Sequence, residues 1–143
     1  MKRLAALLAA ALAASCGGSD TAPTVIANAT VTTDTFTGTL NPPVNNALQA
    51  NVHNFTVTTA GGNINITLLS AGPPATIQLG LALGNPSSTG GCSIIPGFTA
   101  VTPAGSTAQL PASGAPAGSY CVVVGDVGNV LQAVTYTVTV AHT

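Results

Sequence analysis

The sequence predicts an all-β protein built as an antiparallel sandwich or barrel of seven or eight short strands. Apolar residues alternate with threonine or asparagine in several stretches after residue 30, which is typical of half-buried strands. Turns rich in glycine and proline separate these stretches, and no helical periodicity follows the N-terminal segment. Parallel strands need crossover connections, usually helices, so the sheets are expected to be antiparallel.

The N-terminal segment reads as an export sequence. Lys2 and Arg3 precede an unbroken run of alanine and leucine over residues 4–14, followed by Ser15 and Cys16. The run is too short to cross a bilayer, which takes about 20 apolar residues. We therefore divide the chain into a signal peptide (1–15), a lipidated cysteine with a flexible tether (16–29) and a β-sandwich domain (30–143).

The end of this segment, Ala13-Ala14-Ser15-Cys16, resembles the lipobox of bacterial lipoproteins. The resemblance implies cleavage before Cys16 and attachment of diacylglycerol to its thiol, commonly with a further acyl (palmitate-type) chain on the new amine. Several acyl chains hold a protein stably on a membrane, whereas one binds only marginally. The residue after the cysteine is Gly17 rather than an aspartate, which resembles lipoproteins sorted to the outer membrane. The resemblance implies an outer-membrane location. The alternative is ordinary signal cleavage, which would secrete the protein with Cys16 as a free thiol.

Six stretches show strong alternation, and two weaker strands are expected at 94–101 and 107–110. The strong ones centre on residues 36–40, 54–58, 63–68, 77–83, 120–124 and 134–140. Gly61-Gly62 predicts a tight hairpin between the second and third strands. The stretch at 126–129 predicts a turn before the last strand. Lysine side chains at edge strands commonly prevent pairing with strands of other molecules. No lysine follows residue 2, so proline-rich turns are expected to have this role here.

The cysteine count predicts one disulfide. With Cys16 lipidated, Cys92 and Cys121 remain, and export brings them into an oxidising compartment. A metal-binding or catalytic cysteine lacks its usual sequence partners, because the chain has no CxxC motif. We therefore predict a Cys92–Cys121 bridge.

The charge pattern excludes two classes of partner. No lysine or arginine follows Arg3, and the only acidic residues are Asp20, Asp34 and Asp126. Nucleic-acid binding depends on cations that displace phosphate counterions, so it is excluded. Electrostatic binding to anionic lipid headgroups is excluded for the same reason. The predicted membrane contact is therefore the lipid on Cys16.

The order of motifs resembles the bacterial pre-peptidase C-terminal domain family over nearly the whole mature chain. The matching features are Gly38-Thr39-Leu40 at the end of the first strand, the aromatic strand 53–57 with its Gly61-Gly62 turn, the strand 64–68, the Ala-Gly-x-Tyr strand at 117–124 and the final strand 136–140. The resemblance implies a jelly-roll-like β-sandwich that accompanies exported enzymes as a non-catalytic module. This sequence departs from the family pattern in two ways, because it includes no enzyme and has no acidic cluster. The family's roles as a companion of a peptidase and as a calcium-binding module are therefore not inferred for this chain.

Catalytic groups are scarce. A Ser–His–Asp arrangement could be drawn only from a serine, His53 and Asp126, and no GxSxG motif is present. We expect His53 to be an exposed residue at the start of a strand, and His142 to lie in a frayed C-terminus. Two histidines and three scattered aspartates predict no metal site, and no cofactor motif is found. The protein is therefore interpreted as a non-enzyme, with an unrecognised hydrolase as a remote alternative.

The aromatic residues give one weak ligand-binding candidate. The two tyrosines, Phe36 and Phe55 fall in register with apolar neighbours and are expected in the core. Phe98 follows Pro96-Gly97 in a loop-like stretch and is the aromatic expected to be exposed. The leading interpretation is a lipid-anchored module of the cell envelope that binds an envelope protein or has a structural role. A carbohydrate- or matrix-binding module is the alternative.

Overall fold

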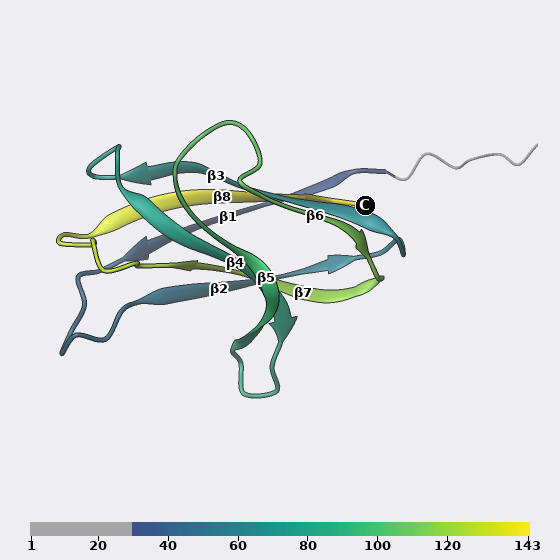
Figure 1. The fold of residues 1–143 in the computed structure, drawn as a ribbon, viewed down its shortest axis with the longest axis horizontal. Helices are drawn as coiled ribbons and strands as arrows, with labels where there is room; N and C mark the ends of the chain where they lie inside the picture. Colours follow the sequence, from purple (N-terminus) through teal and green to yellow (C-terminus); the bar gives the residue numbers. More distant parts are fainter. Residues whose placement is uncertain (1–29) are drawn as a thin grey trace, which may run out of the picture.

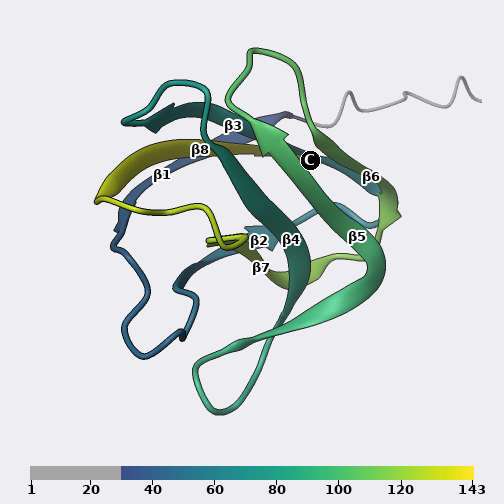
Figure 2. The same cartoon turned by 60° about the vertical axis from the view of Figure 1, so that its left-hand side comes forward.

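The computed structural model describes residues 30–143, so the export segment, the tether and Cys16 lie outside the described residues. Eight antiparallel strands form two stacked four-stranded sheets (Figures 1 and 2). The strands are β1 (Thr32–Leu40), β2 (Ala50–Val57), β3 (Gly62–Gly72), β4 (Gln78–Pro86), β5 (Cys92–Pro103), β6 (Leu110–Ala115), β7 (Gly118–Gly125) and β8 (Val134–His142). Over this part of the chain, no helix is long and apolar enough to cross a bilayer.

The strand order is that of a jelly roll. The first sheet runs β1-β8-β3-β6 and the second runs β2-β7-β4-β5. Only β4 and β5 are neighbours both in sequence and in a sheet, while the other connections cross between sheets. Two interleaved Greek keys of this kind define the jelly roll, which confirms the predicted fold. The predicted hairpin at Gly61-Gly62 is wrong, because β2 and β3 belong to different sheets and the turn instead carries the chain across the sandwich.

The core lies between the sheets and follows the predicted alternation. In β8 the residues Val134, Tyr136, Val138 and Val140 are buried, while the threonines between them face outward. β3 and β4 contribute a similar apolar row each. Each buried branched or aromatic side chain stabilises the fold by roughly 1.5 to 3 kcal/mol through removal of apolar surface from water. The expected core positions of Tyr120, Tyr136 and Phe55 are confirmed, and Phe36 is half-buried against the same core.

The two weaker strands exist but differ from their predicted extents. β5 is longer than the predicted 94–101 and contains Phe98, so the loop-like interpretation of the Phe98 stretch is wrong. β6 covers Leu110–Ala115 rather than 107–110. Its residues Ala-Ser-Gly-Ala have little strand propensity of their own, and pairing with β3 holds them in the sheet.

The predicted disulfide links β5 to β7. The Cα atoms of Cys92 and Cys121 lie 5.9 Å apart and the two sulfur atoms are bonded. Gly84 of β4 lies beneath the bridge, and a Cβ at this position would lie 2.7 Å from the Cys92 sulfur. That Cβ would lie closer still to the Ser93 carbonyl oxygen of β5, so a glycine at residue 84 is needed both for the approach of β5 to β4 and for the bridge.

The sandwich has two open sides, and each is bordered by two edge strands, one from each sheet. β1 and β2 border one side, and β5 and β6 border the other. Side chains that point inward near these edges are only partly covered by the opposite sheet. The His53–Tyr136 pair lies on the β1–β2 side, and an apolar pocket lies on the β5–β6 side.

Candidate functional site

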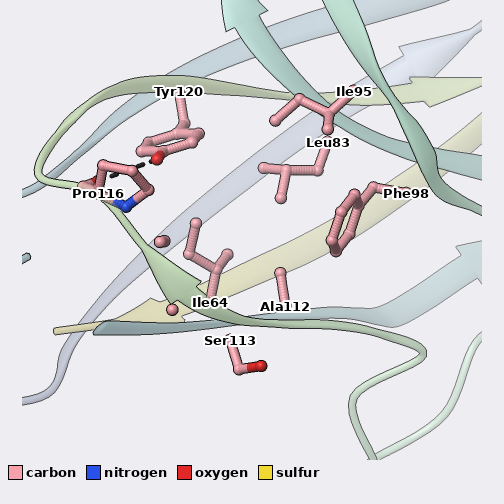
Figure 3. Close-up of a pocket in the computed structure, with 10 residues that line it drawn as sticks. Ile64, Leu83, Ile95, Phe98, Ala112, Ser113, Pro116 and Tyr120 are labelled. Carbon is pink, nitrogen blue, oxygen red and sulfur yellow. Dashed lines mark hydrogen bonds between the residues drawn. The ribbon is translucent and has the colours of Figure 1, made fainter. Parts of the chain in front are cut away.

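The β5–β6 side contains an apolar pocket of about 200 Å³ that opens between the sheets (Figure 3). Its walls come from five strands and the turn after β6. Side chains of Ile64, Leu83, Ile95, Phe98, Ala112 and Tyr120 converge on the cavity from different strands (Figure 3). The pocket exists because Ala112, Gly114 and Ala115 of β6 are too small to fill the space opposite β5.

The pocket offers a ligand no free polar side chain. The Tyr120 hydroxyl donates a hydrogen bond of 2.9 Å to the carbonyl oxygen of Pro116. Ser113 belongs to the pocket rim, but its hydroxyl points away from the cavity (Figure 3). The deeper part of the pocket therefore favours an apolar group, since a polar atom placed there would exchange hydrogen bonds to water for contacts with hydrocarbon.

The structure places Phe98 in the wall of this pocket. Its ring is half-buried and packs against the core rather than standing free on the surface. The exposed stacking platform expected of Phe98 is therefore not formed. Among residues 30–143, the large apolar side chains classed as exposed are all aliphatic. The row of exposed aromatics that would favour carbohydrate binding does not occur in this part of the chain.

A second group of functional side chains lies on the β1–β2 side. The Nε2 atom of His53 lies 2.8 Å from the Tyr136 hydroxyl, and the His53 ring stacks on Phe36 at a centroid distance of 4.9 Å. Gly38 of β1 makes room for this pair, because a Cβ there would collide with the Tyr136 hydroxyl. His53 is thus inward-pointing and half-buried within β2, not an exposed residue at a strand start as expected from the sequence.

Burial keeps this pair neutral at neutral pH. Desolvation lowers the pKa of His53 below its ordinary value, because water no longer stabilises the imidazolium fully. Desolvation likewise raises the pKa of Tyr136, and a hydrogen bond with Asn51 opposes part of this shift. A neutral histidine bonded to a neutral phenol has no activated nucleophile beside it. The pair is best understood as a hydrogen bond that joins β2 to β8 across the open side.

His142 is buried rather than frayed, which corrects the sequence-based expectation. It lies at the end of β8, is 4% exposed, and its Nε2 is 3.0 Å from the Asp34 carboxylate of β1. The Phe55 ring packs nearby, at a centroid distance of 5.4 Å. Pairing of β8 with both β1 and β3 holds the C-terminal residues in the sheet. Sequence position alone gave no indication of these contacts.

Asp126 stabilises its own loop and is not part of a triad. Its Oδ1 atom accepts hydrogen bonds from the backbone N–H groups of Gly128, Asn129 and Val130, at 2.8, 3.0 and 3.1 Å. His53 pairs with Val122 in the β2–β7 ladder, four residues before Asp126, which separates the two along the strands by about 13 Å. The Ser–His53–Asp126 arrangement is therefore not formed. The turn predicted at 126–129 is present, within the connection from β7 to β8.

Metal coordination has no site in the part of the chain that the structure describes. No group of three or more histidine, cysteine, aspartate or glutamate side chains comes together within residues 30–143. His53 and His142, which a sequence search would choose first, instead bond to Tyr136 and Asp34. The described residues also form other hollows, including one of about 260 Å³ lined in part by Leu81, Ile94 and Val101 and one of about 320 Å³ lined in part by Ile77, Leu131 and Val134. The pocket on the β5–β6 side is chosen as the candidate ligand site because its walls come from both sheets and open into the space between them.

Comparison with known proteins gives no functional relative. No protein-family model matches the chain, and no curated protein matches its sequence. Among solved structures, the chain is similar to a Burkholderia pseudomallei antigen and type I fimbria protein, at 13% identity and a TM-score of 0.33, over 80% of this chain and 98% of that chain. A likeness at this level carries no information on function. The resemblances to lipoproteins and to the pre-peptidase C-terminal domain stay predictions.

Proposed function

We propose that the protein is a non-catalytic module of the bacterial cell envelope that binds an apolar group of a partner in the pocket between β5 and β6. The observation that carries the proposal is this pocket of about 200 Å³, whose lining is mostly apolar and whose Tyr120 hydroxyl is already bonded to the Pro116 carbonyl oxygen. Enclosed apolar cavities of similar volume in other proteins take up small apolar molecules. This pocket is open to solvent on one side, so a ligand can enter it without unfolding the domain. An accessible cavity of this kind is a ready site for hydrocarbon.

The size of the pocket sets the size of the group. A water molecule occupies about 30 Å³ in the liquid, and a methylene group is of similar volume, so the pocket accommodates about seven carbon atoms. This matches part of an acyl chain or one large apolar side chain. The polar part of such a partner would remain outside the cavity, in contact with the uncharged loops at its rim.

Lipid attachment through Cys16 is part of the same proposal and has its own test. We expect the protein from a membrane fraction to have an intact mass that begins at Cys16 and includes two or three acyl chains. It should rise by two hydrogens on reduction of the Cys92–Cys121 bridge. A Cys16→Ser variant should leave the membrane fraction. An unlipidated mass for the natural chain would contradict the anchor and leave a secreted binding module.

Filling the pocket tests ligand binding. Ala112 points into the cavity and Ser113 points away from it (Figure 3), so leucine at each position adds similar bulk to opposite faces of β6. With the chain from residue 16 carrying Cys16→Ser, we expect octanol to show saturation-transfer NMR signals. Ala112→Leu should weaken octanol binding by about tenfold or more, a loss of about 1.4 kcal/mol per tenfold.

Ser113→Leu is the matched control and should bind octanol as the parent does. Thermal unfolding of both variants verifies that each remains folded. Equal octanol binding by the parent and the Ala112→Leu variant would show that octanol binds elsewhere, and it would contradict the assignment of the pocket.

A further inference from the structure

The two open sides of the sandwich differ in the regularity of their edge strands. β5 contains Pro96 and Gly97, with the glycine at a φ of 85°, and its pairing with β4 shifts register. β6 is six residues long, contains Pro111 and also shifts register against β3. Such interruptions prevent an edge from pairing with another strand. β1, by contrast, pairs with β8 over all nine residues without a shift and contains no proline.

The free edge of β1 presents backbone groups that point away from β8. The carbonyl oxygen of Thr39 accepts a hydrogen bond of 3.1 Å from the Asn51 side chain on β2, so it faces away from β8. In an antiparallel strand the direction of the N–H and C=O groups alternates between residues. The backbone groups of Thr33, Thr35 and Thr37 therefore face the open side as well. No lysine or arginine lies in residues 30–143 to block this edge.

We propose that the β1 edge is a docking site for β1 of a second copy of this chain, paired antiparallel about a two-fold axis at Phe36. This register is the one that pairs all nine residues of both strands. It places Thr35 opposite Thr37 and Thr33 opposite Thr39, with their outward-facing backbone groups directed at each other. The Thr39 carbonyl oxygen exchanges its hydrogen bond from the Asn51 side chain for one from the partner strand. The two copies then share one continuous eight-stranded sheet. The inference is independent of the pocket on the opposite side.

The side chains of β1 suit this pairing. The threonines lie opposite threonines on the outer face, and the two Phe36 rings lie opposite each other on the inner face; both kinds of pair stabilise antiparallel sheets. Asp34 lies opposite Gly38, so the two carboxylates do not face each other, and each is already paired with His142 of its own chain. No like charges meet across the axis.

Charged pairs introduced at the edge test the pairing and its register. For the chain from residue 16 with Cys16→Ser, we expect sedimentation velocity to show a monomer–dimer equilibrium as concentration rises. Thr35→Lys with Thr37→Lys places lysine opposite lysine twice and should leave a monomer. Thr35→Lys with Thr37→Glu places opposite charges in the same positions and should restore the dimer.

Thr137→Lys with Thr139→Lys is the matched control, because it adds the same two charges to the outer face of the neighbouring strand β8. This variant should dimerise as the parent does. The proposal is overturned if the parent stays monomeric at every concentration. It is also overturned if the Lys/Glu variant is as monomeric as the Lys/Lys variant, or if the β8 control loses the dimer too.

Discussion

Replacing both Cys92 and Cys121 with alanine should lower the free energy of unfolding by roughly 3 to 4 kcal/mol. The bridge closes a loop with a sequence separation of 29 residues and ties the edge strand β5 to β7 across β4. Without the bridge, the unfolded chain has a higher conformational entropy, which favours unfolding. We expect a clear fall in the urea midpoint, since the whole stability of a domain of this size is about 5 to 15 kcal/mol.

A reductant supplies the control for this experiment. It should lower the stability of the parent by a similar amount and leave the double alanine variant unchanged. Equal stability of the parent with and without reductant would show that the disulfide does not constrain the fold as described.

Removing the carboxylate of Asp126 should destabilise the protein by roughly 3 kcal/mol, although the residue has no catalytic partner. Asp126→Ala leaves the N–H groups of Gly128, Asn129 and Val130 without their shared acceptor, next to a core in which Val130 is 1% exposed. Gly128 and Asn129 are exposed, so water can reach their N–H groups, whereas Val130 is buried. An unsatisfied buried donor such as the Val130 N–H is among the costlier defects that a point mutation introduces. Chemical unfolding of the variant measures the loss.

Asp126→Asn is the informative comparison. An asparagine keeps the oxygen that accepts the three hydrogen bonds, and it replaces Oδ2, which has no hydrogen-bond partner. We expect this variant to retain most of the stability that the alanine variant loses. A loss as large as that of alanine would mean that the negative charge stabilises the loop, or that the amide N–H groups placed at the buried Oδ2 position find no acceptor.

The elements with clear alternation could be predicted from sequence, because inward and outward positions differ sharply in polarity. β8 is the clearest case, with valine and tyrosine inside and threonine outside. The Gly61-Gly62 turn was predicted as a hairpin since local sequence specifies that the chain turns, not which sheet it joins. The range predicted for β6 was wrong for a related reason. Its small residues have little strand propensity and form a strand only because β3 pairs with them.

The candidate site was only partly accessible to sequence reasoning. Phe98 was singled out, but as an exposed residue in a loop, whereas it lines a cavity between two sheets. The pocket depends on small residues of β6 lying opposite β5, and this long-range arrangement leaves no local pattern. The same holds for the pairing of His142 with Asp34, which joins residues 108 positions apart.

The most direct test of the proposed function is a methyl NMR spectrum of the domain titrated with octanol. Binding in the pocket should shift the methyl signals of Ile64, Leu83 and Ile95, which line it, and leave the exposed Val44 and Leu69 unaffected. Shifts at the exposed methyl groups with none at Ile64, Leu83 or Ile95 would show that hydrocarbon only coats the surface. That result would contradict the assignment of an apolar binding site between β5 and β6.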